Sequence, residues 1–151
     1  MQLLTFKSKN IIKSQEIGVI LSSLYPLCSM LTVGAIAKKS FVNVPRSEAI
    51  ENVLVVLYKC GRIRGFDFFS GKNITVYLNY YRNEPLIRNL RVFKSQGFSR
   101  HFSVVDLYNY AVKSKVVHPT NILILSTPVG IITHWEAMVN KVGGIGLLEL
   151  Q

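Results

Sequence analysis

Acidic residues are scarce in this sequence, and cysteine and tryptophan are scarcer still. The 151 residues include 8 Asp and Glu against 18 Lys and Arg, a formal net charge of +10. Such a charge favours polyanionic partners, either nucleic acid or an anionic membrane surface, and is no evidence about the fold. A chain of this length can bury one or two modest cores, which predicts one compact unit or two small lobes.

The two cysteines, Cys28 and Cys60, lie far apart in the sequence and form no Cys-x-x-Cys motif. This spacing supports neither a zinc site nor a disulfide framework. We therefore expect both to be buried small hydrophobic residues in a reducing compartment, and we expect no metal and no other cofactor.

Residues 17–37 contain no charged side chain and are long enough to suggest a membrane span. A central Pro26 and several hydroxyl residues favour a core helix instead, with Pro26 at its first position. The face expected to point into the core consists of Leu27, Met30, Leu31 and Gly34. A membrane-associated protein is the alternative, and a carbonate wash separates the two.

Catalytic candidates are few. Ser126, His134 and Glu136 are the only nucleophile, base and carboxylate close together in the sequence, and there is no Gly-x-Ser-x-Gly elbow or P-loop. Glu136 has a capping role, and a His at the start of a short helix is typically solvated or faces a ligand such as RNA. We predict that the chain is not an enzyme, with a hydrolase using Ser126 and His134 as the alternative.

The carboxyl-terminal stretch has a distinctive order of elements. Residues 122–125 predict a buried strand, and residues 126–130 a polar turn. Thr133, with Glu136 three residues later, predicts a capped short helix. Gly143-Gly144 is expected to end that helix before a last strand over residues 145–150.

This order resembles the carboxyl-terminal signature of the small-subunit ribosomal protein S8 family. The family usually has Ser and Lys where this chain has Pro128 and Val129, and Glu where it has Ile145. The residues that match in register are Ser126, Thr127, Gly130, Ile131, Ile132, Thr133, Ala137, Gly143 and Gly144.

The resemblance covers most of the chain from Tyr25 to Gln151. Residues 1–24 are read as an added extension: a cleaved presequence, an arm that touches RNA, or a packed segment. The pattern further predicts a strand over residues 41–45, a helix from its Ser47 cap to Cys60, and a hairpin of residues 62–69 and 74–79. Residues 86–93 are expected to add a third strand to that sheet.

A helix capped by Ser103 is predicted over residues 104–112, followed by a basic connector over residues 113–119. The expected fold is therefore α+β with two small lobes. Residues 25–93 form an amino-terminal lobe of helix, strand, helix and sheet. Residues 94–151 form a mostly antiparallel β lobe with a short helix.

The resemblance implies a structural constituent of the small ribosomal subunit that binds the central domain of small-subunit ribosomal RNA and supports its folding and assembly. Its partners would be that RNA and neighbouring ribosomal proteins, with no small-molecule substrate and no membrane insertion. The composition favours a mitochondrial ribosome, with a plastid or bacterial-type ribosome as alternatives. A basic RNA-binding or membrane-associated protein unrelated to the ribosome is the other function considered.

Two groups of residues are expected to contact RNA. Paired RNA displays 2′-hydroxyls in a shallow minor groove, where small hydroxyls and close backbone approach are useful. By motif match, the first group is Ser126, Thr127, Gly130, Gly143 and Gly144. The basic group is Lys38, Lys39, Arg88, Arg91, Lys94 and Arg100. Without the resemblance, an ordinary polar turn and helix termination explain the first group. Trp135 could stack on RNA, although packing under the helix is the simpler role.

Overall fold

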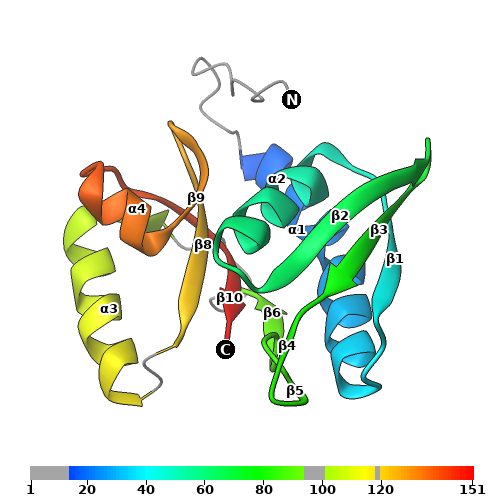
Figure 1. The fold of residues 1–151 in the computed structure, drawn as a ribbon. Helices are drawn as coiled ribbons and strands as arrows, with labels where there is room; N and C mark the ends of the chain where they lie inside the picture. Colours follow the sequence, from blue (N-terminus) through cyan, green and yellow to red (C-terminus); the bar gives the residue numbers. More distant parts are fainter. Residues whose placement is uncertain (1–13, 94–100, 118–119) are drawn as a thin grey trace.

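The computed structural model describes residues 14–93, 101–117 and 120–151, which form two lobes of mixed helix and antiparallel sheet (Figure 1). The predicted α+β class is confirmed. The amino-terminal elements are α1 (Ser14–Ile36), β1 (Phe41–Pro45), α2 (Glu48–Lys59), β2 (Ile63–Ser70), β3 (Asn73–Leu78), β4 (Tyr80–Tyr81) and β5 (Glu84–Pro85). The later elements are β6 (Leu90–Val92), β7 (His101–Phe102), α3 (Val104–Val117), β8 (Ile122–Thr127), β9 (Gly130–Thr133), α4 (His134–Val139) and β10 (Gly144–Leu150).

The first sheet follows the local sequence signals closely. Its strands lie in the order β1-β3-β2, all antiparallel, and the predicted hairpin is β2 and β3. Ser47 caps α2 as expected, accepting a hydrogen bond from the Ile50 backbone N–H. Gly61, with a φ of 72°, follows the last turn of that helix in the left-handed conformation. The predicted strand, helix and hairpin are confirmed here.

Helix α1 begins well before the expected position. It is helical from Ser14, so Pro26 lies inside the helix, and its prediction as the first helical residue is wrong. The Pro26 ring is exposed, so the carbonyl that loses its helical donor lies on the solvent side. Leu27 and Leu31 are buried as predicted, whereas Met30 is 38% exposed. Leu24 is fully buried, so part of the segment read as an extension packs into the core.

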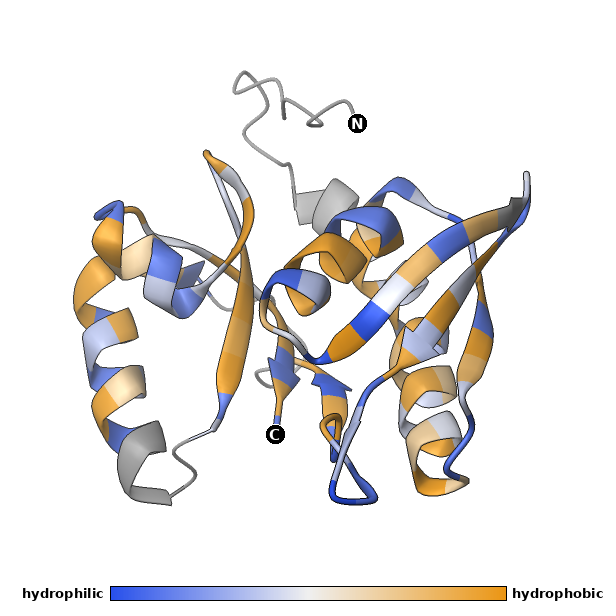
Figure 2. Ribbon diagram, in the orientation of Figure 1, coloured by the Kyte–Doolittle hydropathy of each residue, from blue (hydrophilic) through white to orange (hydrophobic). Residues whose placement is uncertain are grey.

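The same helix is the one described helix long and apolar enough to cross a membrane. Its window Gly18–Ile36 has a mean hydropathy of 1.8, and a third of the window is buried. Figure 2 shows hydrophobic residues along much of the α1 ribbon. Its buried side chains pack against β1, β6 and α2. The length and apolar composition of α1 are weak evidence of a membrane span, because the core helix of a soluble protein can be equally long and apolar.

The second sheet differs from the expected arrangement. Its strands lie in the order β6-β10-β8-β9, with β7 also paired to β10. Residues 90–92, expected as a third strand of the first sheet, pair with β10 instead, as in Leu90 with Leu150. The strand added to the first sheet is β1. The lobe boundaries after residues 24 and 93 stay predictions, although α1 runs through the first of them without a break.

This second sheet separates two hydrophobic cores. Leu123 and Leu125 of β8 face the core formed with α3 and α4, while Ile124 faces the core formed with α1 and α2. This alternation is the ordinary period of a strand. Consequently the larger core includes residues of both lobes. Ser103 caps α3 as predicted, but the helix continues to Val117 and occupies much of the expected connector; residues 118–119 lie outside the described residues.

We expect Leu24→Ala to lower the free energy of unfolding by about 2–5 kcal/mol, because it leaves a cavity in the shared core. Val19→Ala, on an exposed position of the same helix, is the matched control and should change stability by less than about 0.5 kcal/mol. Urea denaturation of the full chain measures both values. Equal, small effects would mean that residues before Tyr25 do not contribute to the core.

Candidate functional site

The five small residues of the predicted site gather at one end of the second sheet. This hydroxyl–glycine cluster comprises Ser126, Thr127, Gly130, Gly143 and Gly144. Thr127 and Gly130 are opposite each other across the β8–β9 turn, and Ser126 is opposite Ile145 on β10. The pairing brings together residues that the chain separates by the whole of β9 and α4.

The two hydroxyl residues are more buried than a polar turn implies. Ser126 and Thr127 belong to β8 and are each 5% exposed, so the turn itself consists of Pro128 and Val129, both exposed. The Thr127 hydroxyl donates to the Gly130 carbonyl oxygen at 2.8 Å and accepts from the Val129 N–H at 3.3 Å. Thr127 therefore holds the turn in shape from inside the strand.

The expected role of Gly143-Gly144 in ending α4 is wrong. The helix is capped at its start by Thr133, as predicted, but its last residue is Val139. Lys141 takes the left-handed position, with a φ of 54°, and its N–H donates to the Met138 carbonyl. This is the hydrogen-bond pattern of an ordinary helix end, completed before the glycines begin.

The glycines are needed for close packing instead. A Cβ added to Gly144 would lie 2.5 Å from the Ser126 carbonyl oxygen, and one added to Gly143 would lie 2.5 Å from the Phe102 carbonyl oxygen. Both distances are shorter than a carbon and an oxygen can approach. Gly130 is required for another reason, since its φ of 128° is unfavourable for other residues.

His134 does not face solvent or a ligand, so that expectation is wrong. Its side chain is fully buried, and Nδ1 accepts a hydrogen bond from the Leu123 backbone N–H at 3.1 Å. The ring lies against Tyr110 and Trp135, with centroid distances of 5.5 and 4.5 Å. Burial lowers the pKa of His134 to about 4, so the imidazole is neutral near pH 7. Trp135, expected to pack under the helix, is 40% exposed.

These contacts leave no catalytic arrangement around Ser126 within the described part of the chain. His134 uses one ring nitrogen for the Leu123 backbone and leaves the other buried without a hydrogen-bond partner. Glu136 is exposed, and its backbone N–H rather than its carboxylate serves the Thr133 cap. Over residues 14–93, 101–117 and 120–151 no group of three His, Cys, Asp or Glu side chains could hold a metal ion.

The basic residues predicted for the site occupy other parts of the molecule. Lys38 and Lys39 are exposed and follow the carboxyl-terminal end of α1, which lies at the opposite end of the molecule from the β8–β9 turn (Figure 1). Arg88 is exposed in the segment between β5 and β6. Lys94 and Arg100 lie outside the described residues. The predicted site is therefore divided between two ends of the protein.

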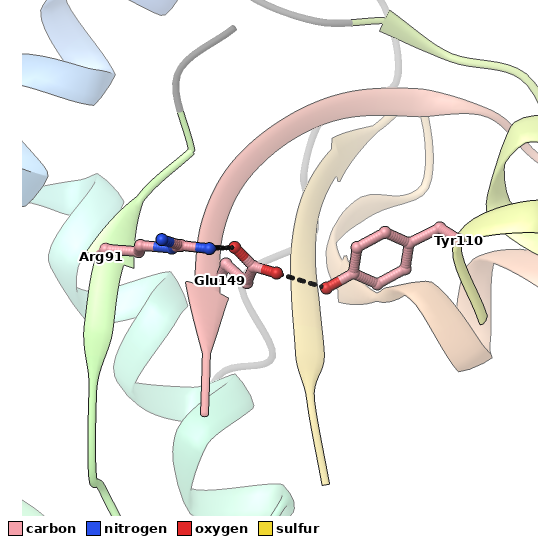
Figure 3. A network of polar contacts seen from close by, with 3 residues as sticks. All are labelled: Arg91, Tyr110 and Glu149. Carbon is pink, nitrogen blue, oxygen red and sulfur yellow. Dashed lines mark hydrogen bonds and ion pairs between the residues drawn. The ribbon is translucent and has the colours of Figure 1, made fainter. Parts of the chain in front are cut away.

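Arg91 takes part in a network that the sequence did not reveal (Figure 3). Its guanidinium donates to the Glu149 carboxylate at 2.6 and 2.9 Å, and the Tyr110 hydroxyl donates to the same carboxylate at 3.0 Å. Burial, followed by the Glu149 charge, raises the pKa of Tyr110. The contacts join β6, β10 and α3. A lone carboxylate within an apolar final strand was the available signal for this network.

Comparisons with known proteins agree with one another. Residues 26–150 match the family model described as "Ribosomal protein S8". The chain is 38% identical over 130 residues to "Small ribosomal subunit protein uS8m" of Acanthamoeba castellanii, covering 86% of this chain and 99% of that protein. It is 34% and 36% identical over 126 residues to the uS8 proteins of Rhodospirillum centenum and Agrobacterium fabrum, covering 79% of this chain and 91% of each relative.

Gly144→Ala is expected to destabilise the protein by several kcal/mol, on the order of 2–4, because the new methyl group meets backbone that cannot move away. Gly65→Ala is the matched control, also a strand glycine, with nothing within 4 Å of its added Cβ. Thermal and urea unfolding of both variants measure the difference. A Gly144→Ala protein as stable as the control would contradict the close packing of β10 on β8.

His134 should make stability depend on pH. Below pH 6.5 the unfolded chain takes up a proton on His134 that the folded protein takes up only near pH 4. The folded state therefore loses up to about 3 kcal/mol as the pH falls through this range.

His134→Asn keeps an acceptor for the Leu123 N–H and removes the titration. The variant should be less stable than wild type at about pH 7.5, and the difference should shrink towards about pH 4.5. Urea unfolding across this range measures both proteins. A difference independent of pH would show that His134 keeps its ordinary pKa in the folded state.

Proposed function

Since the chain belongs to the ribosomal protein S8 family, we propose that it binds the central domain of small-subunit ribosomal RNA and supports the folding and assembly of that domain. Membership makes it a structural protein of the small ribosomal subunit and not an enzyme. The observation that carries the proposal is the family match over residues 26–150, which includes the whole hydroxyl–glycine cluster.

The geometry of the β8–β9 turn supports RNA contact at this end of the molecule. The turn is held by the Thr127 hydroxyl and is packed on Gly144, so its backbone is fixed before any partner arrives. Paired RNA is recognised mainly by its shape and by its 2′-hydroxyls, which suits a rigid backbone edge with few long side chains. A surface ordered in advance also lowers the entropic cost of binding.

The hydroxyls contribute in two ways under this proposal. Thr127 shapes the turn from within, while the largely buried Ser126 and Gly130 and the closely packed backbone of Gly143 and Gly144 form the rigid edge that presents the turn to the RNA. The exposed Pro128 and Val129 occupy positions where the family usually has Ser and Lys. Here the turn would therefore rely on shape, with little charge of its own.

The basic residues supply the charge from elsewhere on the surface. Lys38, Lys39 and Arg88 are exposed and available for phosphates. Arg91 is only partly available for phosphate, because its guanidinium is paired with Glu149, although its side chain is 57% exposed. Lys94 and Arg100 are proposed as contacts on the sequence pattern alone. Binding at both ends would let one small protein hold two segments of a folding RNA domain together.

We further propose the mitochondrial ribosome as the site of action, together with neighbouring small-subunit proteins as partners. The similarity to uS8m of Acanthamoeba castellanii supports the organellar assignment. The bacterial uS8 relatives are similar over nearly the same length, so a plastid or bacterial-type ribosome is the alternative.

The turn can be tested by placing a negative charge on it. Val129→Glu should weaken binding to a central-domain RNA fragment by about tenfold, because a carboxylate at the interface repels phosphate and must be desolvated. Val112→Glu, at an exposed position of α3, is the matched control of equal charge and should have a much smaller effect. Filter binding or fluorescence anisotropy over a salt series measures both.

An unrelated RNA duplex serves as the specificity control in the same series. The wild-type protein should prefer the central-domain fragment, and Val129→Glu should lose part of that preference. If the two variants weakened binding equally, and equally for both RNAs, the β8–β9 turn would not be the contact. The protein would then bind RNA only through its overall charge.

A further inference from the structure

The outer face of the first sheet carries exposed aromatic rings. Helices α1 and α2 pack on the inner face, where Val42, Val76 and Leu78 point into the core. Phe41 and Tyr77 are directly opposite each other on β1 and β3, so their side chains share the other face. They are 49% and 38% exposed. No described element covers these rings.

The rest of this face keeps the rings accessible. Gly65, the partner of Tyr77 on β2, has no side chain, and the space beside its Cα is open. The Asp67 carboxylate near the Tyr77 hydroxyl raises the pKa of that phenol. One step along the sheet, the Thr75 hydroxyl donates to the Asn43 side-chain oxygen at 2.8 Å. The outer face therefore carries aromatic and polar groups, together with one exposed acidic residue, Asp67.

A third exposed ring and a cation lie on the β4–β5 hairpin, which follows β3 in the chain and forms its own two-stranded sheet. Tyr80 packs against the core, so its neighbour Tyr81 points away from the core and is 62% exposed. The Arg82 guanidinium lies 5.2 Å from the centre of the Tyr81 ring. The Tyr80 hydroxyl donates to the Lys39 carbonyl oxygen, which fixes the β4–β5 hairpin beside the basic end of α1.

A groove follows the free edge of β1 and begins at Lys39. Its volume is about 580 Å³, and it is lined by Met30 of α1 and by residues 39–43, including Lys39 and Phe41. Phe41 and Lys39 both line this groove, and the hydrogen bond from Tyr80 to the Lys39 carbonyl places the β4–β5 hairpin next to its lysine end. The β8–β9 turn is at the other end of the molecule (Figure 1).

We propose that this face, comprising Phe41, Tyr77 and Tyr81 with Lys38, Lys39 and Arg82, binds a short run of unpaired RNA. Bases stack on the three rings, and the lysines and Arg82 hold the phosphates. Aromatic side chains beside a basic groove are the arrangement by which proteins hold single strands without reading their sequence. Charge complementarity favours RNA over a protein segment, because Arg82 lies over the Tyr81 ring, Lys39 lines the groove beside Phe41, and the chain carries a net charge of +10.

This inference rests on the proposed function only in taking RNA as the partner, since the proposed function needs no unpaired nucleotides. Fluorescein-labelled octauridylate and octaadenylate report the aromatic face, whereas a central-domain fragment reports the proposed function. Val129→Glu should leave octamer binding unchanged. Binding of the octamers can therefore be absent while binding of the central-domain fragment is retained, and the reverse.

The variants separate stacking from other contributions. Phe41→Leu, Tyr77→Leu and Tyr81→Leu each remove a ring, and each should weaken octamer binding by roughly fivefold to a hundredfold. Tyr77→Phe and Tyr81→Phe keep the ring and should bind like wild type. Tyr108→Leu, at an exposed tyrosine of α3, is the matched control and should have no effect. Thermal unfolding of each variant checks that the fold is kept.

Fluorescence anisotropy with the full chain at two salt concentrations gives the affinities. Any of three results overturns the inference. In the first, the wild-type protein does not bind the octamers. In the second, the three Leu variants bind them as well as Tyr108→Leu does. In the third, the Phe variants lose as much affinity as the Leu variants. Loss confined to the three Leu variants, with binding that weakens as salt rises, supports it.

Discussion

The pairing of β10 with its neighbours is the constraint on which the rest of this structure depends. The strand binds β8 along one edge and both β6 and β7 along the other. Gly144 lets its first residues lie against the end of β8, and Glu149 joins it to Arg91 and Tyr110. Because side chains from this sheet enter the cores on both of its faces, the two lobes are packed as one unit.

This arrangement explains how a protein with few long side chains at its candidate RNA contact could recognise RNA. The β8–β9 turn is held by the Thr127 hydroxyl, the Gly130 conformation and the packing of β10, so its backbone has a fixed shape. The exposed Lys38, Lys39 and Arg82, with the rings of Phe41 and Tyr81, lie away from this turn, around the end of α1 and the β4–β5 hairpin. A rigid body with two different proposed contact surfaces suits the proposed role in RNA folding.

Local features could be predicted from the sequence because their causes lie within a few residues. Ser47, Ser103 and Thr133 cap their helices as expected, and the hairpin of β2 and β3 follows from alternation around a glycine turn. Features that depend on residues far apart in the chain could not be predicted from the sequence. Residues 90–92 pair with β10 because of partners almost sixty residues away, and His134 is buried because α3 and β8 enclose it.

The glycines show the same distinction within the candidate site. The sequence singled out Gly143 and Gly144, but local reasoning assigned them to a helix end. Their actual requirement comes from β7 and β8, which approach within a distance that no side chain allows. Pro26 was likewise predicted from local rules to begin a helix, whereas α1 begins at Ser14 and has the Pro26 ring on its exposed side.

The most direct test of the central claim is ultraviolet cross-linking of intact small ribosomal subunits, followed by mass spectrometry of the peptides of this protein that carry nucleotides. We expect the protein to sediment with the small subunit. Peptides containing the β8–β9 turn should be cross-linked to nucleotides of the central domain. A protein that sediments free of the subunit, or cross-links confined to another RNA domain, would contradict the proposed function.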